Sequence, residues 1–142
     1  MIRFDDFLQS GEFGPIRFDA SQEDIRGILG PPDDIGNPEA IHWPTELWFY
    51  GGSFLQVFFE TKQVIGVGLY FRYPTQLPQA LDMDHIPFSK ESNRAEIGLY
   101  LSERKIHHRL GGWSGESIII ADATEIVLDV DGDRLDRILA FR

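Results

Sequence analysis

Residues 21–32 read SQEDIRGILGPP, and this stretch predicts a short helix that begins at Ser21 and ends at Gly30. The Ser21 hydroxyl suits an N-cap, because it can accept a hydrogen bond from a backbone N–H that the first turn leaves unpaired. Asp24, three residues later, can complete a capping box. The apolar residues have the i, i+3, i+4 spacing of one helix face: Ile25, Ile28 and Leu29. Such a short helix is stable only when it packs on something else.

Three apolar, aromatic-rich runs follow this helix at residues 47–50, 54–59 and 64–71. The Gly51-Gly52 pair between the first two runs is a hairpin signal. The third run alternates apolar residues with other residues, as a half-buried strand does. Two adjacent hairpins predict an antiparallel meander packed against the helix.

The same order returns about 71 residues later, which indicates an internal repeat. Asn93 takes the place of Ser21, and the following helix stripe matches the first one at an offset of 72 residues. Residues 118–120 and 126–130 match the first two strands, and 135–141 form the last one. We therefore expect an α+β fold: a tandem pseudo-repeat of a short helix followed by a three-stranded antiparallel meander, with the helices packed on one sheet face. Residues 1–142 would form a single domain, with pseudo-repeat 1 at about 14–72, a connector at 73–90 and pseudo-repeat 2 at about 91–142.

Composition narrows the classes of function. The 142 residues include no cysteine and carry a formal net charge of −10. The charge excludes the basic face that nucleic-acid binding needs, and the lack of cysteine excludes thiolate chemistry. No apolar run reaches the length of a signal peptide or a membrane span. We therefore expect a soluble cytoplasmic protein with no membrane partner.

Three motifs that could carry chemistry are better explained as structure. The adjacent His107-His108 lack the helical spacing and the third ligand that a metal motif needs. Residues 129–133, DVDGD, fail the calcium-loop spacing and suit an Asp-Gly turn. Residues 112–115, GWSG, are one residue short of a nucleophile elbow. The sequence thus predicts no catalytic residue, no metal site and no cofactor.

Aromatic residues of the first unit are the best candidates for a functional surface. On the run 54–59 both faces are largely apolar, and Gly66 and Gly68 would leave a shallow bare patch beside Tyr70. One alternative is that the N-terminal segment, the connector or the other sheet buries this face. The other is an exposed aromatic patch, rimmed by acid, that binds a protein partner. The candidate partner-binding residues are Trp43, Trp48, Tyr50, Phe54, Phe58, Tyr70 and Trp113.

Two resemblances accompany these patterns. The capped helix ending in LGPPD at 29–33, followed by Trp48-Phe49-Tyr50 and a hairpin, resembles the helix-then-sheet repeat of beta-lactamase-inhibitor proteins and of small outer-membrane assembly lipoproteins. The size and acidity of the whole chain are similar to those of small bacterial immunity proteins. These resemblances imply a binding module without catalytic activity.

We therefore expect a non-enzymatic, cytoplasmic protein-binding module, with immunity-type inhibition of a toxin as its most specific form. Acidic residues would steer it towards a basic protein partner. The alternative is a small-ligand-binding or enzymatic domain whose site lies in the cleft between the two repeats. A third reading is a homodimer that associates through the aromatic face.

Overall fold

A computed structural model describes residues 1–36, 45–112, 116–121, 123–129 and 133–142. Its helices are α1 (Phe4–Ser10), α2 (Gln22–Leu29) and α3 (Arg94–Glu103). Its strands are β1 (Asp34–Gly36), β2 (Thr45–Tyr50), β3 (Leu55–Glu60), β4 (Gln63–Tyr70), β5 (His108–Gly111), β6 (Ser117–Ile120), β7 (Thr124–Leu128) and β8 (Leu135–Phe141). None of these helices is long and apolar enough to cross a membrane.

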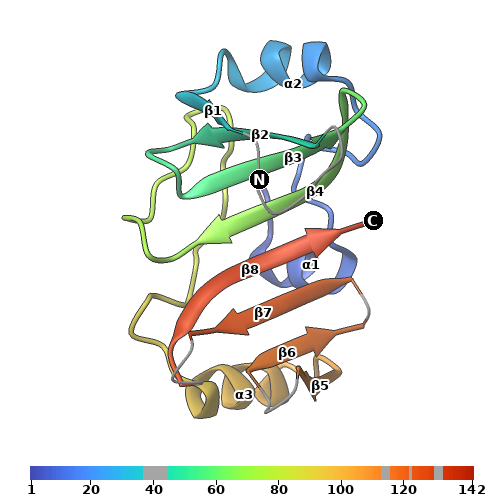
Figure 1. The fold of residues 1–142 in the computed structure, drawn as a ribbon. Coiled ribbons are helices and arrows are strands. Elements are labelled where there is room, and N and C mark those ends of the chain that lie inside the picture. Colours follow the sequence, from blue (N-terminus) through green and yellow to red (C-terminus); the bar gives the residue numbers. More distant parts are fainter. Residues whose placement is uncertain (37–44, 113–115, 122, 130–132) are drawn as a thin grey trace.

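All eight strands form one antiparallel sheet in the order β1-β2-β3-β4-β8-β7-β6-β5 (Figure 1). The two meanders therefore meet in the middle of the sheet, where β4 pairs with β8. The predicted α+β class with antiparallel strands is confirmed. The predicted strand count of three in each meander is wrong, because each has a fourth, short strand at the sheet edge. These edge strands, β1 and β5, span three and four residues and lie outside the runs that the sequence predicted as strands.

Local sequence signals explain where the helices begin. Ser21 accepts a hydrogen bond from the Asp24 N–H at 3.0 Å, and the Asp24 side chain accepts one from the Ser21 N–H at 3.3 Å, so the predicted capping box is formed. Asn93 caps α3 in a similar way, by accepting from the Glu96 N–H at 2.9 Å. Each cap satisfies backbone donors that the first helical turn cannot pair.

One face of the sheet packs on the helices and carries the core. Paired residues of neighbouring strands point to the same face, so the register groups the buried residues Trp48, Val57, Val67 and Ala140 on this covered face. Thr124 of β7 lies in the same row and donates from its hydroxyl to the Leu8 carbonyl of α1. The same core includes Ile25 of α2, Ile97 and Leu101 of α3, and Phe88 of the connector.

Contacts among the helices and the connector close this layer. The Phe88 ring packs edge-on against Phe4 of α1 at 5.5 Å and against Tyr100 of α3 at 5.0 Å. Tyr100 donates to the Asp5 carboxylate at 2.6 Å, and the Arg104 guanidinium lies 3.8 Å from the centre of its ring. The burial of its hydroxyl and the Asp5 carboxylate both raise the pKa of Tyr100.

The β2–β3 turn rests on the connector at Gly51. This residue has a φ of 61°, and a Cβ atom there would lie 2.3 Å from the Gln76 carbonyl oxygen. We expect Gly51→Ala to lower the free energy of unfolding by about 2 to 4 kcal/mol, because it adds a left-handed alanine and an overlap with backbone. Urea unfolding followed by circular dichroism measures this change.

Gly98→Ala is the matched control. Gly98 lies inside α3, and no atom lies within 4 Å of a Cβ built there. We expect this variant to raise the free energy of unfolding by about 0.5 to 1 kcal/mol through helix propensity. Equal effects of the two substitutions would contradict the placement of the connector against the turn.

Candidate functional site

The second face of the sheet, here called the open face, carries no described helix, and Figure 1 shows α1 on the far side of the sheet. Strand register assigns residues to it, because side chains alternate between the two faces. One row of paired residues crosses all eight strands: Asp34, Phe49, Gln56, Gly68, Leu139, Glu125, Ile119 and Arg109. This row joins the two meanders across the β4–β8 pair.

Apolar side chains gather on the open face around this central row. The partly exposed ones are Leu47, Phe49, Tyr70, Ile119, Val127 and Leu139, and Phe141 is 43% exposed. Phe58 and Gln56 also lie on this face, at 8% and 4% exposure. Antiparallel sheets with one solvated face usually alternate apolar and polar residues, so an apolar solvated face needs a separate explanation.

Aromatic rings cover the two glycines of β4. A Cβ atom on Gly66 would lie 2.4 Å from a ring carbon of Phe141, and one on Gly68 would lie 2.7 Å from a ring carbon of Tyr70. The rings of Phe58 and Phe141 are 4.9 Å apart and tilted by 58°. The bare patch predicted beside Tyr70 is therefore wrong, because rings from β3 and β8 lie on the glycine backbone and shield it, as aromatic residues do for glycines in sheets.

Three of the predicted binding residues belong to the core. Trp48 is 2% exposed on the covered face, and the Arg26 guanidinium of α2 lies 5.1 Å from the centre of its ring. Its indole N–H donates to the Glu46 carboxylate at 2.8 Å. Tyr50 is 2% exposed and donates to the Gly30 carbonyl at 3.0 Å. Phe54 is fully buried in the β2–β3 turn, where its ring packs edge-on against another phenylalanine at 5.3 Å.

The remaining predicted residues divide into two groups. Phe58 and Tyr70 lie on the open face, and both contact Gly68. A Cβ atom built on Gly68 would lie 3.4 Å from the Phe58 ring. Trp43 and Trp113 lie outside the described residues. The structure therefore brings together two of the seven predicted residues on the open face and places three others in the core.

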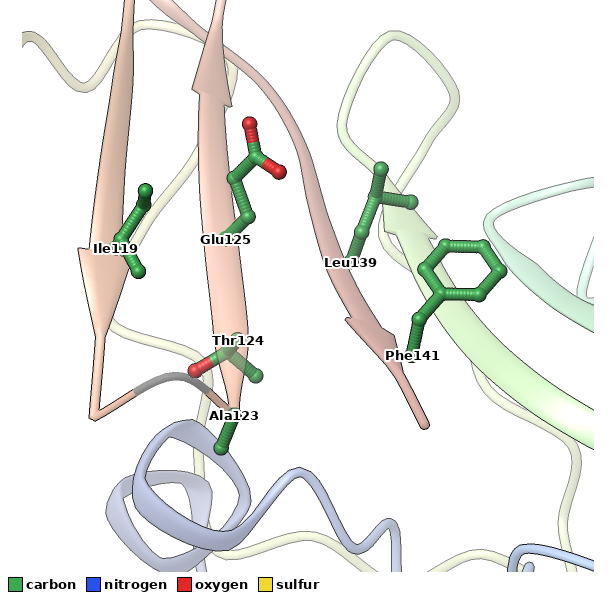
Figure 2. A pocket seen from close by; sticks show the side chains of 6 residues that line it. All are labelled: Ile119, Ala123, Thr124, Glu125, Leu139 and Phe141. Carbon is green, nitrogen blue, oxygen red and sulfur yellow. The ribbon is translucent and has the colours of Figure 1, made fainter. Parts of the chain in front are cut away.

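A hollow of about 230 Å³, the first hollow, lies on the open face near the start of β7. Figure 2 shows Ile119, Glu125, Leu139 and Phe141 projecting around it from three neighbouring strands. Ala123 and Thr124 close its lower end. It combines an exposed carboxylate with aliphatic and aromatic walls.

A second hollow, of about 540 Å³, lies at the other end of β7 and β8 and is strongly charged. Arg72 donates two hydrogen bonds to the Asp136 carboxylate, at 3.0 and 3.1 Å. Arg137 binds the same carboxylate at 2.5 Å. Two guanidiniums thus share one carboxylate, and the Arg72 guanidinium also lies 5.8 Å from the centre of the Tyr70 ring. Burial raises the pKa of Tyr70, while both arginines oppose that shift.

Sequence patterns missed the contribution of the second meander to this face. Leu139, Phe141 and Glu125 supply much of the first hollow, yet they come from strands far from β3 in the sequence. Alternation along 135–141 gives the two faces of that strand. Only the pairing of β8 with β4 shows that Leu139 and Phe141 lie beside the glycines of the first meander.

The histidine and carboxylate side chains are spread over the described part of the chain. Among them, no three histidine or carboxylate side chains gather closely enough to hold a metal ion. The His108 ring nitrogen Nδ1 lies 2.9 Å from the Ile106 carbonyl, a local contact of the β5 edge. A shallow hollow of about 300 Å³ lies beside this histidine, lined also by His107, Lys105 and Ser102.

Comparison with known proteins gives structural matches alone. No family model matches the chain, and no curated protein matches it by sequence. One similar solved structure is an extracellular protein containing an SCP domain from Bacillus anthracis, with a TM-score of 0.49 and 9% identity over 94% of this chain and 46% of that one. Another is a cysteine-rich secretory protein from Staphylococcus aureus, also with a TM-score of 0.49 and 9% identity, over 99% of this chain and 49% of that one. The chain thus spans about half the length of each.

These matches count against two expectations from the sequence. The resemblances to beta-lactamase-inhibitor proteins, assembly lipoproteins and immunity proteins are not supported, because the structures found are of a different kind. The expected cytoplasmic location is not supported either, since the names of both proteins describe extracellular or secretory proteins. Matches at this TM-score and identity carry no information on the activity or partners of this chain.

The pH dependence of stability tests the burial of Tyr50. Burial raises its pKa to about 12, whereas an unfolded tyrosine has a pKa of about 10. Between these values the unfolded chain loses the proton and the folded chain keeps it, so the stabilisation present below pH 10 is lost as pH rises towards 12. We expect Tyr50→Phe to make this decline shallower in urea unfolding measured from pH 9 to 12. Equal slopes for both proteins would contradict the burial of this hydroxyl.

Proposed function

We propose that this chain is a protein-binding module without catalytic activity, and that its contact surface is the open face. The observation that carries the proposal is a set of apolar side chains, interrupted by Gln56 and Glu125, on a sheet face that no described helix covers. Leu139 and Phe141 lie at the centre of this set, beside the Phe58 ring. Exposed apolar patches rimmed by polar residues are typical of protein interfaces.

The geometry of the open face favours a protein over a small molecule. The central row crosses the whole sheet, so its apolar residues are spread over many strands rather than gathered in one deep cavity. A segment of the partner that runs along the central row could contact Phe49, Leu139 and Ile119 together. Aromatic and aliphatic residues of this kind supply most of the binding energy at the centres of protein interfaces.

Charge favours a basic partner. The net charge of −10 creates a negative field around the molecule, and such a field speeds association with a positively charged protein. The open face itself carries both signs. Its acidic members include Asp34 and Glu125, and its arginines include Arg137, which is already bound to Asp136. The excess of negative charge therefore acts over long range, and the apolar set supplies the contact.

The second hollow favours one alternative, a small-ligand site. It has the volume of a ligand pocket, and it lies at one end of β7 and β8, beside Arg72, which follows β4. Its arginines could bind an anionic group bidentately. Asp136 already takes two hydrogen bonds from the Arg72 Nη2, so an anionic ligand would share or compete for this guanidinium.

We also propose that the chain is a tandem repeat of one helix-plus-meander unit, now with four strands in each unit. Equivalent contacts in the two halves support this proposal. The N-cap Ser21 forms an isolated antiparallel bridge with Gln63 at the start of β4, and the N-cap Asn93 forms one with Arg134 just before β8. Backbone hydrogen bonds repeat in the same places: Gln22 to Lys62 and Arg94 to Asp133, both 3.0 Å, and Val64 to Ala20 and Leu135 to Ser92, both 2.8 Å.

An experimentally determined structure tests the repeat directly. We expect residues 20–29 and 62–70 to superpose on residues 92–101 and 133–141, with each N-cap bridged to the last strand of its own unit. A helix α3 that packs on the opposite face of the sheet, or that lacks the bridge at Asn93, would contradict the repeat.

Peptide selection tests the proposed contact surface. A random peptide library displayed on phage is selected on the immobilised chain, and the selected peptides are measured against two variants. We expect Leu139→Asp to weaken binding by about tenfold or more, because a charge at an interface centre removes a contact of hot-spot size. Leu99→Asp, on the exposed side of α3, should leave binding unchanged; Leu99 is 60% exposed.

Folding of the Leu139→Asp variant is checked by thermal unfolding, and Phe141→Ser serves as the milder variant of the same surface. Peptides that bind both open-face variants as tightly as the wild type would overturn the proposal. Association of the chain with itself, seen by sedimentation at several concentrations and abolished by Leu139→Asp, would instead identify a second copy as the partner.

A further inference from the structure

We infer that Glu125 is the recognition point for a lysine or arginine side chain of the protein partner. This inference rests on the proposed function, since it assumes that a protein covers the open face. Glu125 lies in the central row of the sheet, directly between Ile119 on β6 and Leu139 on β8. A carboxylate is thus set among aliphatic side chains in the middle of an otherwise apolar region.

The Glu125 side chain is exposed and has no hydrogen bond or ion pair with any described residue. Arg137 is the nearest candidate on the neighbouring strand, because it pairs with Val127 and is therefore the diagonal neighbour of Glu125. Its guanidinium, however, binds Asp136 at 2.5 Å. Asp136 also binds Arg72, so both arginines of the second hollow already have another carboxylate as partner.

Covering the open face makes a cation necessary at this point. Any apolar surface that settles on Leu139 and Phe141 also removes water from Glu125. A carboxylate that loses water without gaining a partner is strongly unfavourable. A protein that binds here must therefore bring a hydrogen-bond donor to Glu125, and a charged donor forms the stronger bond.

The first hollow fits an amphipathic cation. A lysine or arginine side chain has an aliphatic stem and a charged end, and the hollow has aliphatic walls at Ile119 and Leu139 with a carboxylate between them. Its volume of about 230 Å³ accommodates one such side chain. The Phe141 ring, 43% exposed, forms the side of the hollow and offers a face for the stem or for a cation–π contact. An acidic or purely apolar side chain lacks this match.

Two synthetic peptides test the inference on the full chain. Both are acetylated and amidated; one alternates leucine with lysine, and the other alternates leucine with glutamine. Backbone amide shifts of the isotope-labelled protein give the dissociation constants at low salt. We expect the lysine peptide to bind about five- to tenfold more tightly, since a hydrogen bond between charged groups is roughly twice as strong as a neutral one. Its shifts should centre on Glu125, Leu139 and Phe141.

The variant Glu125→Gln should remove most of the preference for lysine, leaving the part that the net charge of −10 gives over long range, and should leave the binding of the glutamine peptide nearly unchanged. Glu103→Gln, at the exposed end of α3, is the matched control; it removes the same charge and should keep the preference. Two results would overturn the role of Glu125. In the first, both variants keep the full preference for lysine. In the second, Glu125→Gln keeps it and Glu103→Gln loses it.

The same titration separates this failure from failure of the proposed function. If Leu139→Asp still abolishes binding while Glu125→Gln has no effect, the open face remains the contact surface and the role of Glu125 is wrong. If the peptide shifts map to the helices, and Leu139→Asp binds like the wild type, the proposed function is wrong as well.

Discussion

The antiparallel pairing of β4 with β8 is the constraint on which the rest of the structure depends. It joins two meanders into one sheet, and it sets the register that places Val67 opposite Ala140 and Leu69 opposite Ile138. These four residues face the helices and are buried. A slip by one residue would turn every side chain of β8 to the other face, exposing Ile138 and burying Arg137. The burial of the core therefore fixes this register strongly.

The same register creates the open face. It sets Leu139 beside Gly68 and Phe141 beside Gly66, so that large side chains of β8 lie on the bare backbone of β4. The rings of Phe58 and Phe141 meet there at 4.9 Å. Glycine at these two positions thus has a packing role, because a Cβ atom would displace the rings that make the surface flat and apolar. Glu125 enters this surface from β7, across from Leu139.

Local features of the fold were predictable from the sequence, since they arise within a few residues. The cap at Ser21 and the hairpin at Gly51-Gly52 have this origin, and the structure contains both. The edge strands β1 and β5 were not predictable, because three or four residues give no clear period. The pairing of β4 with β8 joins segments far apart in the chain, and no local pattern specifies it.

The candidate site was predictable only in part, for a related physical reason. Alternation divides the residues of a strand between two faces but does not say which face the helices cover. Strands β2 and β3 have apolar residues on both faces, so Trp48 and Phe58 seemed equivalent as binding residues. In the structure α2 covers Trp48, whereas Phe58 lies on the open face. The contribution of Leu139 and Phe141 depends on the central strand pair and was missed with it.

Hydroxyl-radical footprinting of the free chain tests most directly whether one face of the sheet is open to solvent, as it is among the described residues. We expect oxidation of Phe141 and Tyr70 on the open face and protection of Trp48 and Phe59 on the covered face. Tryptophan is intrinsically the more reactive residue, so protection of Trp48 is a stringent result. Protection of Phe141 and Tyr70 to the same extent as Phe59, in dilute solution where the chain is monomeric, would contradict the account.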